Sequence, residues 1–119
     1  MKTPEYTYFA YVSSVYDGDS ITLDIDMGLN IWSMGQKIRL YGINTPEVRG
    51  PDKERGIVVR DYVRHELLFV AQGKVLIRTH KDRKGKYGRW LATVYYGDNY
   101  ERNLNEELVQ LGYAGPYLG

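Results

Sequence analysis

A strict alternation of apolar and polar residues constrains the fold of this 119-residue chain more than any other feature of its sequence. Between Ser20 and Asp26, every second side chain is aliphatic, which is the period of a β-strand with one buried face. Four further segments are rich in aromatic and β-branched residues and have the length of strands. These segments are residues 8–16, 37–43, 75–80 and 90–96. We therefore expect a chain organised around five strands.

Two helical patterns lie among these strands. The first covers residues 53–71 and is followed by Gly73, a residue type that commonly ends helices. The second covers residues 104–111, with Asn103 as its expected N-cap and Gly112 at its end. The apolar stripe of the first helix consists of Val59, Val63, Leu67 and Val70.

The resulting order of elements is β-β-β-α-β-β-α, in a single domain of residues 1–119. Five short strands with a helix between the third and the fourth are typical of the OB-fold, a five-stranded Greek-key β-barrel. We predict a mainly β, α+β chain of this type with a short C-terminal helix. Element order alone also fits a generic α+β domain.

Several classes of protein are excluded by what the sequence lacks. The chain has no cysteine, which excludes disulfides and thiolate zinc sites, and His65 and His80 are its only histidines. No apolar run approaches the ~20 residues of a membrane span, and the N-terminus lacks the apolar core of a secretory signal. We expect a monomer without membrane contact, cytoplasmic as the sequence stands, or secreted if a signal peptide originally preceded it.

Positive charge is concentrated in the middle of the chain, although the formal net charge is only +1. Residues 35–96 contain fourteen basic and six acidic residues, whereas both flanking segments are acidic. Such a field suits an anionic polymer, and the twelve tyrosines and two tryptophans offer rings that can stack on nucleobases. A solvated basic face and sheet-filling tyrosines explain the same composition.

Three segments at expected strand ends could carry chemistry. Asp17–Ser20 has two carboxylates around a glycine, which could bind a divalent cation or form an ordinary polar turn. Residues 39–47 combine a strand arginine with a loop that holds an amide, a hydroxyl and a carboxylate, or they form a surface salt bridge. In residues 81–89 five of nine residues are basic, with glycines that let backbone amides approach a phosphate, or the segment is a solvated hairpin.

Together these segments supply the groups that phosphodiester hydrolysis requires. A cation polarises the phosphoryl oxygen, guanidinium groups bind the charge that grows on the phosphate, and a carboxylate helps to activate water.

The same segments resemble, in order, the motifs of the staphylococcal nuclease (thermonuclease) family, and the resemblance runs from about Tyr8 to Ala114. The matching motifs are the Asp-Gly-Asp turn, the arginine strand that runs into Thr-Pro-Glu, Lys-Tyr-Gly-Arg, and Asn-Glu-x-Leu-Val-x-x-Gly. The resemblance implies an OB-fold and a calcium-dependent phosphodiesterase that acts on nucleic acid.

The resemblance also implies a role for each matching residue. The arginines would bind the scissile phosphate and stabilise its transition state, and the glutamate would act as a general base on water beside the metal. The implied catalytic residues are Arg39, Glu47 and Arg89. The implied metal ligands are Asp19, Asn44 and Thr45, the last through its backbone carbonyl. The implied substrate-binding residues are Lys84, Lys86 and Tyr87.

Asn44 departs from the family pattern, which usually has aspartate at this position. The loss of one negative charge predicts weaker calcium binding or a preference for another divalent cation, unless Asp17 compensates. The leading hypothesis is a metal-dependent nuclease that hydrolyses DNA, with RNA as an open second substrate, and with little sequence specificity. The alternative is a catalytically weak or inactive nuclease-like OB domain that binds nucleic acid. A protein-interaction barrel would explain neither the basic middle nor the arginines and glutamate.

Overall fold

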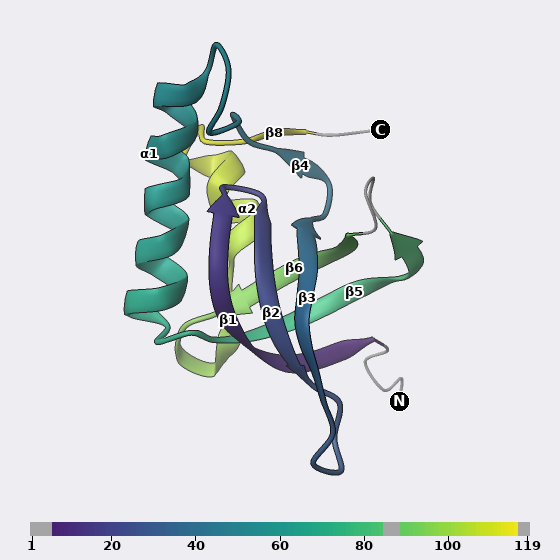
Figure 1. The fold of residues 1–119 in the computed structure, drawn as a ribbon. Helices are drawn as coiled ribbons and strands as arrows, with labels where there is room; N and C mark the ends of the chain where they lie inside the picture. Colours follow the sequence, from purple (N-terminus) through teal and green to yellow (C-terminus); the bar gives the residue numbers. More distant parts are fainter. Residues whose placement is uncertain (1–5, 85–88, 117–119) are drawn as a thin grey trace.

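The computed structural model describes residues 6–84 and 89–116, with the backbone alone for residues 81–84. Its front layer is an antiparallel meander of three strands (Figure 1). They are β1 (Thr7–Asp17), β2 (Ser20–Asp26) and β3 (Trp32–Leu40). The β1–β2 connection is the expected turn, because Asp17 and Ser20 pair directly across it.

Two further strands close this meander into a barrel. They are β5 (Lys74–Lys84) and β6 (Trp90–Tyr96), which pair with each other in antiparallel fashion and cross behind the meander (Figure 1). β5 pairs with β1, and β6 pairs in parallel with the end of β3. The five strands thus form a closed mixed barrel, which confirms the predicted OB-like fold.

The alternation seen in β2 is the pattern of the barrel core. Its aliphatic side chains are buried, with Leu23 completely inaccessible, while the polar residues between them stay partly exposed. Buried apolar side chains from every barrel strand and from both helices complete one continuous core. Burying such side chains is the main favourable term in folding.

The predicted helix over residues 53–71 consists of two parts. α1 (Lys53–Arg64) lies along β1, and a wider π-helical turn, His65–Val70, continues it. The expected stripe holds for Val59, Val63 and Leu67, which are buried, but Val70 is 46 % exposed. The prediction for Val70 was wrong because the wider turn shifts the residues after Arg64 away from the α-helical spacing.

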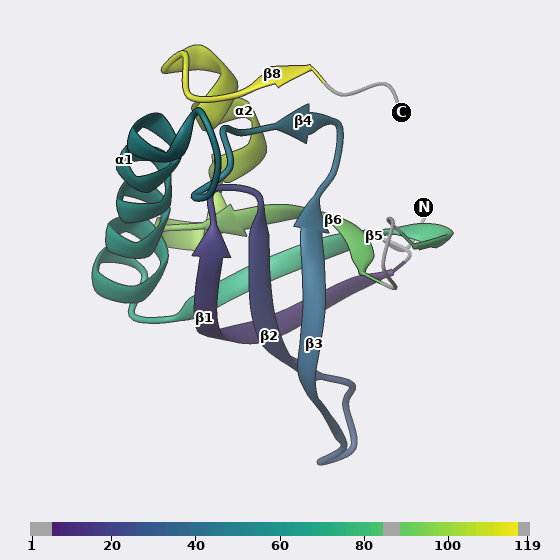
Figure 2. The ribbon, with the colours of Figure 1, turned by 45° about the horizontal axis from the view of Figure 1, so that its top comes forward.

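The predicted third strand, residues 37–43, is interrupted near its end. β3 stops at Leu40, Gly42 turns the chain with a φ of +77°, and β4 (Ile43–Asn44) follows. β4 pairs with β8 (Gly115–Pro116), so the C-terminal segment lies over the same end of the barrel (Figure 2). The glycine allows a left-handed turn that other residues adopt only with strain.

The C-terminal part adds a 3₁₀ turn (Asp98–Tyr100), β7 (Arg102–Asn103) and α2 (Leu104–Gln110). The side chain of Asn103 accepts a hydrogen bond from the Glu106 N–H at 3.1 Å, which confirms it as the N-cap of α2. Neither helix in the described part of the chain has the length and apolar character needed to cross a bilayer.

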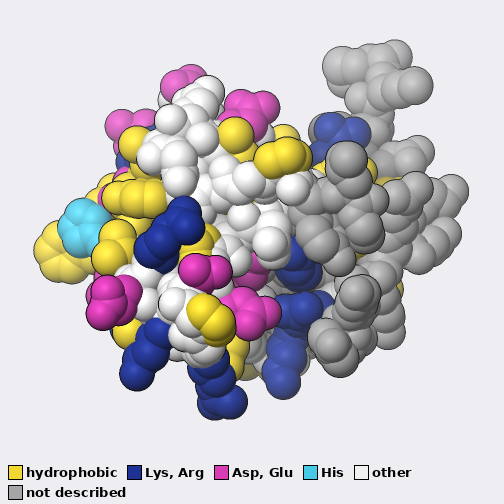
Figure 3. Space-filling view, turned by 90° about the horizontal axis from the view of Figure 1, so that it is seen from above, with side chains coloured by type: hydrophobic (Ala, Val, Ile, Leu, Met, Phe, Trp, Pro, Cys, Tyr) yellow, Lys and Arg dark blue, Asp and Glu magenta, His cyan; other side chains and the backbone are white. Residues whose placement is uncertain are grey.

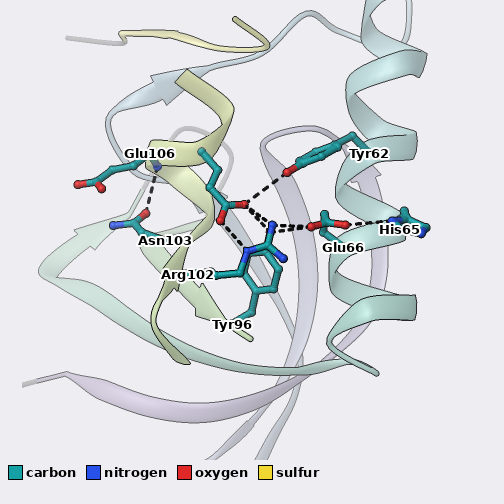
Figure 4. A network of polar contacts seen from close by, with 8 residues as sticks. Tyr62, His65, Glu66, Tyr96, Arg102, Asn103 and Glu106 are labelled. Carbon is teal, nitrogen blue, oxygen red and sulfur yellow. Dashed lines mark hydrogen bonds and ion pairs between the residues drawn. The ribbon is translucent and has the colours of Figure 1, made fainter. Parts of the chain in front are cut away.

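A partly buried polar network joins the two helices (Figure 4). Arg102 donates to Glu66 at 2.6 Å and to Glu107 at 2.8 Å, and the hydroxyl of Tyr96, with one proton to donate, lies within hydrogen-bond distance of both carboxylates. Burial alone would raise the pKa of Glu66, but hydrogen bonds from His65, Arg102 and Tyr96 outweigh it and lower that pKa. Glu66 is therefore held as a carboxylate between α1 and α2.

Candidate active site

Two of the sequence segments, Asp17–Ser20 and residues 39–47, meet Arg89 of the third at one end of the barrel, the upper end in Figures 1 and 2. The β1–β2 turn packs so tightly there that a Cβ on Gly18 would come within 2.5 Å of Val59 on α1. The carbonyl of Asp19 accepts a hydrogen bond from the Leu40 N–H at 2.9 Å, which fixes the turn against the end of β3.

Asp19 is the centre of the hydrogen bonds at this end. Its Oδ2 accepts from Arg39 Nη2 at 3.4 Å and from the backbone N–H of Thr45 at 3.1 Å. The same Arg39 nitrogen donates to Asn44 Oδ1 at 3.1 Å. Asp19 and Arg39 are both buried, so this ion pair is less screened by solvent than a surface pair would be.

Arg89 reaches the same group through a serine. Its Nη1 donates to Ser20 Oγ at 2.7 Å, and that hydroxyl lies 3.4 Å from Asp19 Oδ1. Arg89 comes from the segment just before β6, so closure of the barrel brings it beside β2. Arg39 is thus linked directly to the Asp19 carboxylate, and Arg89 is linked to it through Ser20.

Glu47 lines a small cavity together with Arg89. The cavity has a volume of about 350 Å³, and its lining includes Asp17, Lys37, Glu47 and Arg89. Figure 3 looks onto this end of the molecule, where acidic side chains near the centre are bordered by lysine and arginine side chains. The cavity is large enough for several water molecules or a phosphate group.

The loop that carries Glu47 is positioned by a close contact with α1. A Cβ on Gly56 would come within 2.1 Å of the Glu47 carbonyl oxygen and within 2.8 Å of the Val48 nitrogen. Only a residue without a side chain allows the loop to approach the helix this closely. Gly56 therefore determines where the Glu47 backbone lies.

Asp17 brings a second carboxylate to the turn. Its Oδ1 accepts from the Asp19 N–H at 3.3 Å. Burial, together with the hydrogen bond and the charge of Asp19, raises the pKa of Asp17 to about 6.

Oxygen atoms of the kind that a hard divalent cation prefers lie at this end of the barrel. Asp19 and Asn44 present a carboxylate and an amide oxygen to the same guanidinium nitrogen, and the Thr45 peptide lies against Asp19. Within residues 6–84 and 89–116, the buried Thr45 hydroxyl has no hydrogen-bond partner. The described residues contain no cluster of three His, Cys, Asp or Glu side chains, so amide and carbonyl oxygens would have to complete the coordination.

The structure thus brings six of the nine candidate residues together. Asp19, Arg39, Asn44 and Thr45 are joined by direct hydrogen bonds, Arg89 is linked to them through Ser20, and Glu47 lines one cavity with Arg89. For Lys84 the structure describes the backbone alone, at the end of β5. Lys86 and Tyr87 lie outside the described residues.

Sequence reasoning did not assign roles to three residues that shape the site. Ser20 links Arg89 to Asp19, and its place directly after the Asp-Gly-Asp turn was the available signal. Lys37 lines the cavity, and the alternation of β3 already places it on the same strand face as Arg39. Gly56 had no sequence signal, because only the packed structure shows what its missing side chain allows.

The fold and the site define an OB-type barrel that gathers arginines and oxygen ligands at one end. Residues 37–118 match the family described as Staphylococcal nuclease homologue, and the chain belongs to this family.

Similar proteins come from archaea and bacteria. A thermonuclease of Staphylococcus hyicus is 33% identical over 92% of this chain and 59% of its own length. A thermonuclease of Staphylococcus intermedius is 30% identical over 87% of this chain and 56% of its own length. An uncharacterized protein of Methanocaldococcus jannaschii is 30% identical over 93% of this chain and 60% of its own length. The chain therefore spans about three fifths of the length of these curated relatives.

Proposed function

We propose that this chain is a nuclease that hydrolyses phosphodiester bonds in nucleic acid with a divalent cation, calcium being the first candidate. The observation that carries the proposal is that Arg39 pairs directly with the Asp19 carboxylate and Arg89 is linked to it through Ser20, beside a cavity that Glu47 and Arg89 line. Two of the relatives are named thermonucleases. A barrel that only binds protein has no chemical need for this set of residues.

In this proposal, Asp19, Asn44 and the Thr45 carbonyl hold the cation, which supplies Lewis-acid polarisation of the phosphate when bound. Arg39 and Arg89 donate to the phosphate oxygens with planar forks, and these hydrogen bonds strengthen as negative charge grows in the transition state. Glu47 accepts a proton from the attacking water across the cavity.

The positions of the arginines are set before substrate arrives. Arg39 is held by Asp19 and Asn44, and Arg89 is held by Ser20, so little side-chain freedom remains to be lost on binding. The basic residues of segment 35–96 favour a polymeric substrate, because an extended polyanion gains binding energy from positive charges beyond the reacting phosphate.

The direct test is degradation of single-stranded DNA by the purified chain with calcium, stopped by a chelator. We expect Arg89→Lys to lower kcat sharply with an unchanged unfolding curve, because lysine keeps the charge but loses the fork. Arg60→Lys is the matched control, since Arg60 pairs with its neighbour Asp61 on α1 at 3.0 Å. Near-normal hydrolysis by Arg89→Lys would contradict the role given to this arginine.

A specific observation favours the second candidate, a domain that binds nucleic acid without cutting it. Asn44 brings an uncharged oxygen where the family usually has a carboxylate, so the site has one negative charge fewer for a cation. Tight binding of single-stranded DNA without cleavage at any calcium, magnesium or manganese concentration would establish that alternative instead.

A further inference from the structure

A second, larger cavity lies on the other side of the Glu47 loop. Its volume is about 610 Å³, and it is an open cavity lined by residues 44–47, the start of α1 and residues 112–116. Glu47 and Arg49 line both this cavity and the smaller one that contains Arg89. The two cavities therefore adjoin, and a chain molecule that occupies one can continue into the other.

The larger cavity contains two arginines that the fold does not use. Arg49 and Arg55 both line it and are exposed. In the described part of the chain neither forms an ion pair or hydrogen bond through its side chain. By contrast, the guanidinium groups of Arg64 and Arg102 hold the Val15 carbonyl and the helix-joining network. Side chains without a structural partner keep their full capacity to bind an anion.

Three other features of the cavity suit one linkage of a nucleic acid strand. It lies at the N-terminal end of α1, where Asp52 makes no side-chain cap hydrogen bond and the helix dipole is positive. Tyr113 lines the opposite wall and packs against Tyr62 with ring centroids 5.3 Å apart, which holds an aromatic surface in place. The carboxylates of Glu47 and Asp52 also line the cavity, and they disfavour a doubly charged terminal phosphate more than a singly charged diester.

We propose that Arg49 and Arg55 form a second phosphate subsite, which binds a phosphodiester of the same strand on the far side of Glu47 from Arg89. This inference rests on the proposed function, because it assumes that the reacting phosphate lies between Arg39 and Arg89. A strand bound in this way extends past the reaction centre in both directions. The subsite therefore favours an internal linkage of an oligonucleotide over the only linkage of a dinucleotide.

The first test compares two substrates in the full chain with calcium. They are a dinucleotide with one phosphodiester and a single-stranded oligodeoxynucleotide of about ten nucleotides. We expect Arg49→Gln and Arg55→Gln each to lower the ratio of kcat/KM for the oligonucleotide to that for the dinucleotide by about three- to tenfold. Arg60→Gln is the matched control on the same helix and should leave this ratio unchanged.

The second test measures binding alone and does not depend on cleavage. One phosphate of the oligonucleotide at a time is replaced by an uncharged methylphosphonate, and Kd is measured by fluorescence anisotropy with a chelator present. At one position we expect the neutral linkage to weaken binding to the parent chain but to have no further effect on Arg55→Gln. The slope of log Kd against log salt should also fall by about one for each arginine removed.

The outcomes separate this inference from the proposed function. The subsite would be overturned, and the nuclease left intact, by two results together. The variants would hydrolyse both substrates with the parent's kcat/KM ratio, and each neutral linkage would weaken binding to parent and variants equally. Absence of hydrolysis in the parent chain, with the coupling at one linkage still present, would overturn the nuclease and leave a nucleic-acid subsite. Loss of binding in Arg49→Lys and Arg55→Lys as complete as in the glutamine variants would show that the forks and not the charges recognise the phosphate.

Discussion

Position 44 decides how the site shares one guanidinium group. Arg39 Nη2 donates both to the Asp19 carboxylate and to the Asn44 amide oxygen. A neutral amide leaves most of the guanidinium charge for Asp19, and it adds no charge that would attract a cation. An aspartate at position 44 would compete with Asp19 for the Arg39 guanidinium. It would also add a negative oxygen beside Asp19 that attracts a cation.

We predict that Asn44→Asp tightens calcium binding and raises hydrolysis at limiting calcium about three- to tenfold, with a smaller effect at saturation. The measurement is a calcium titration of hydrolysis and of heat release for parent and variant side by side. Asn30→Asp, in the β2–β3 connection, is a matched control that adds the same charge away from the site. Equal calcium requirements in parent and Asn44→Asp would show that position 44 does not contribute to a metal site.

Gly56 gives a prediction about the loop. A methyl group at this position would meet the Glu47 carbonyl at 2.1 Å, so Gly56→Ala must displace the loop or the helix. We expect a loss of about 1–3 kcal/mol in the free energy of unfolding and a lower kcat for any reaction that uses Glu47. Urea unfolding and DNA hydrolysis measure the two effects. Val58→Ala, on the exposed face of the same helix, should change neither.

At the scale of elements, the network of Glu66, Tyr96, Arg102 and Glu107 holds α1 and α2 together (Figure 4). It lies where the π-helical turn begins, and that turn directs Glu66 and Leu67 inward while Leu68, Phe69 and Val70 face solvent. A carboxylate buried in this way is stable only while its donors remain in place.

The lowered pKa of Glu66 sets the acid stability of this contact. The unfolded chain takes up the proton at a higher pH than the folded chain, so the stabilisation is complete above the ordinary glutamate pKa and is lost as pH falls toward the folded value. We predict that Glu66→Gln lowers stability at neutral pH and flattens the fall of stability toward about pH 3. Urea unfolding across this range measures it, with Glu54→Gln, an exposed acid of α1, as control. If the free energy of unfolding of Glu66→Gln fell toward low pH as steeply as that of the parent chain, Glu66 would not be the source of the acid sensitivity.

The limits of sequence reasoning also lie at this scale. The period of β2, the Asp-Gly-Asp turn and the Asn103 cap follow from local patterns, and all three were predictable. The π-helical turn that exposes Val70 was not predictable, because it depends on burying Leu67 and on bonding Glu66 to Tyr96 of β6 and Arg102 of β7. The pairing of β4 with β8 joins two-residue segments far apart in the chain, for which no local pattern exists. Within the site, the roles of the charged residues came from motifs that resemble the thermonuclease family, whereas Ser20 and Gly56 act through contacts that only the closed barrel creates.

At the scale of the whole molecule, charge is arranged for a polyanion although the net value is small. Both end segments of the chain are acidic. The basic residues 35–96 between them supply the arginines of both cavities and the lysines of residues 81–89. Long-range attraction of this kind depends strongly on ionic strength.

We predict that replacing Lys84 and Lys86 by glutamine weakens binding to all single-stranded DNA sequences alike and lowers the slope of log Kd against log salt by about two. Anisotropy titrations at several salt concentrations with two unrelated oligonucleotides measure both effects. Lys74→Gln, at the opposite end of β5, is the control for a change of charge alone. An unchanged slope would mean that residues 81–89 form a solvated hairpin without a binding role.

The parallel pairing of β3 with β6 also has a consequence for folding during synthesis. The ribosome makes Asp19, Arg39 and Glu47 early, but the neighbour that β3 needs begins only at Trp90, directly after Arg89. A nascent chain that has emerged only as far as α1 holds most of the reactive side chains on an open meander, with no second arginine beside them. Because translation proceeds from the N-terminus, the candidate site can be assembled only after β6 has been made.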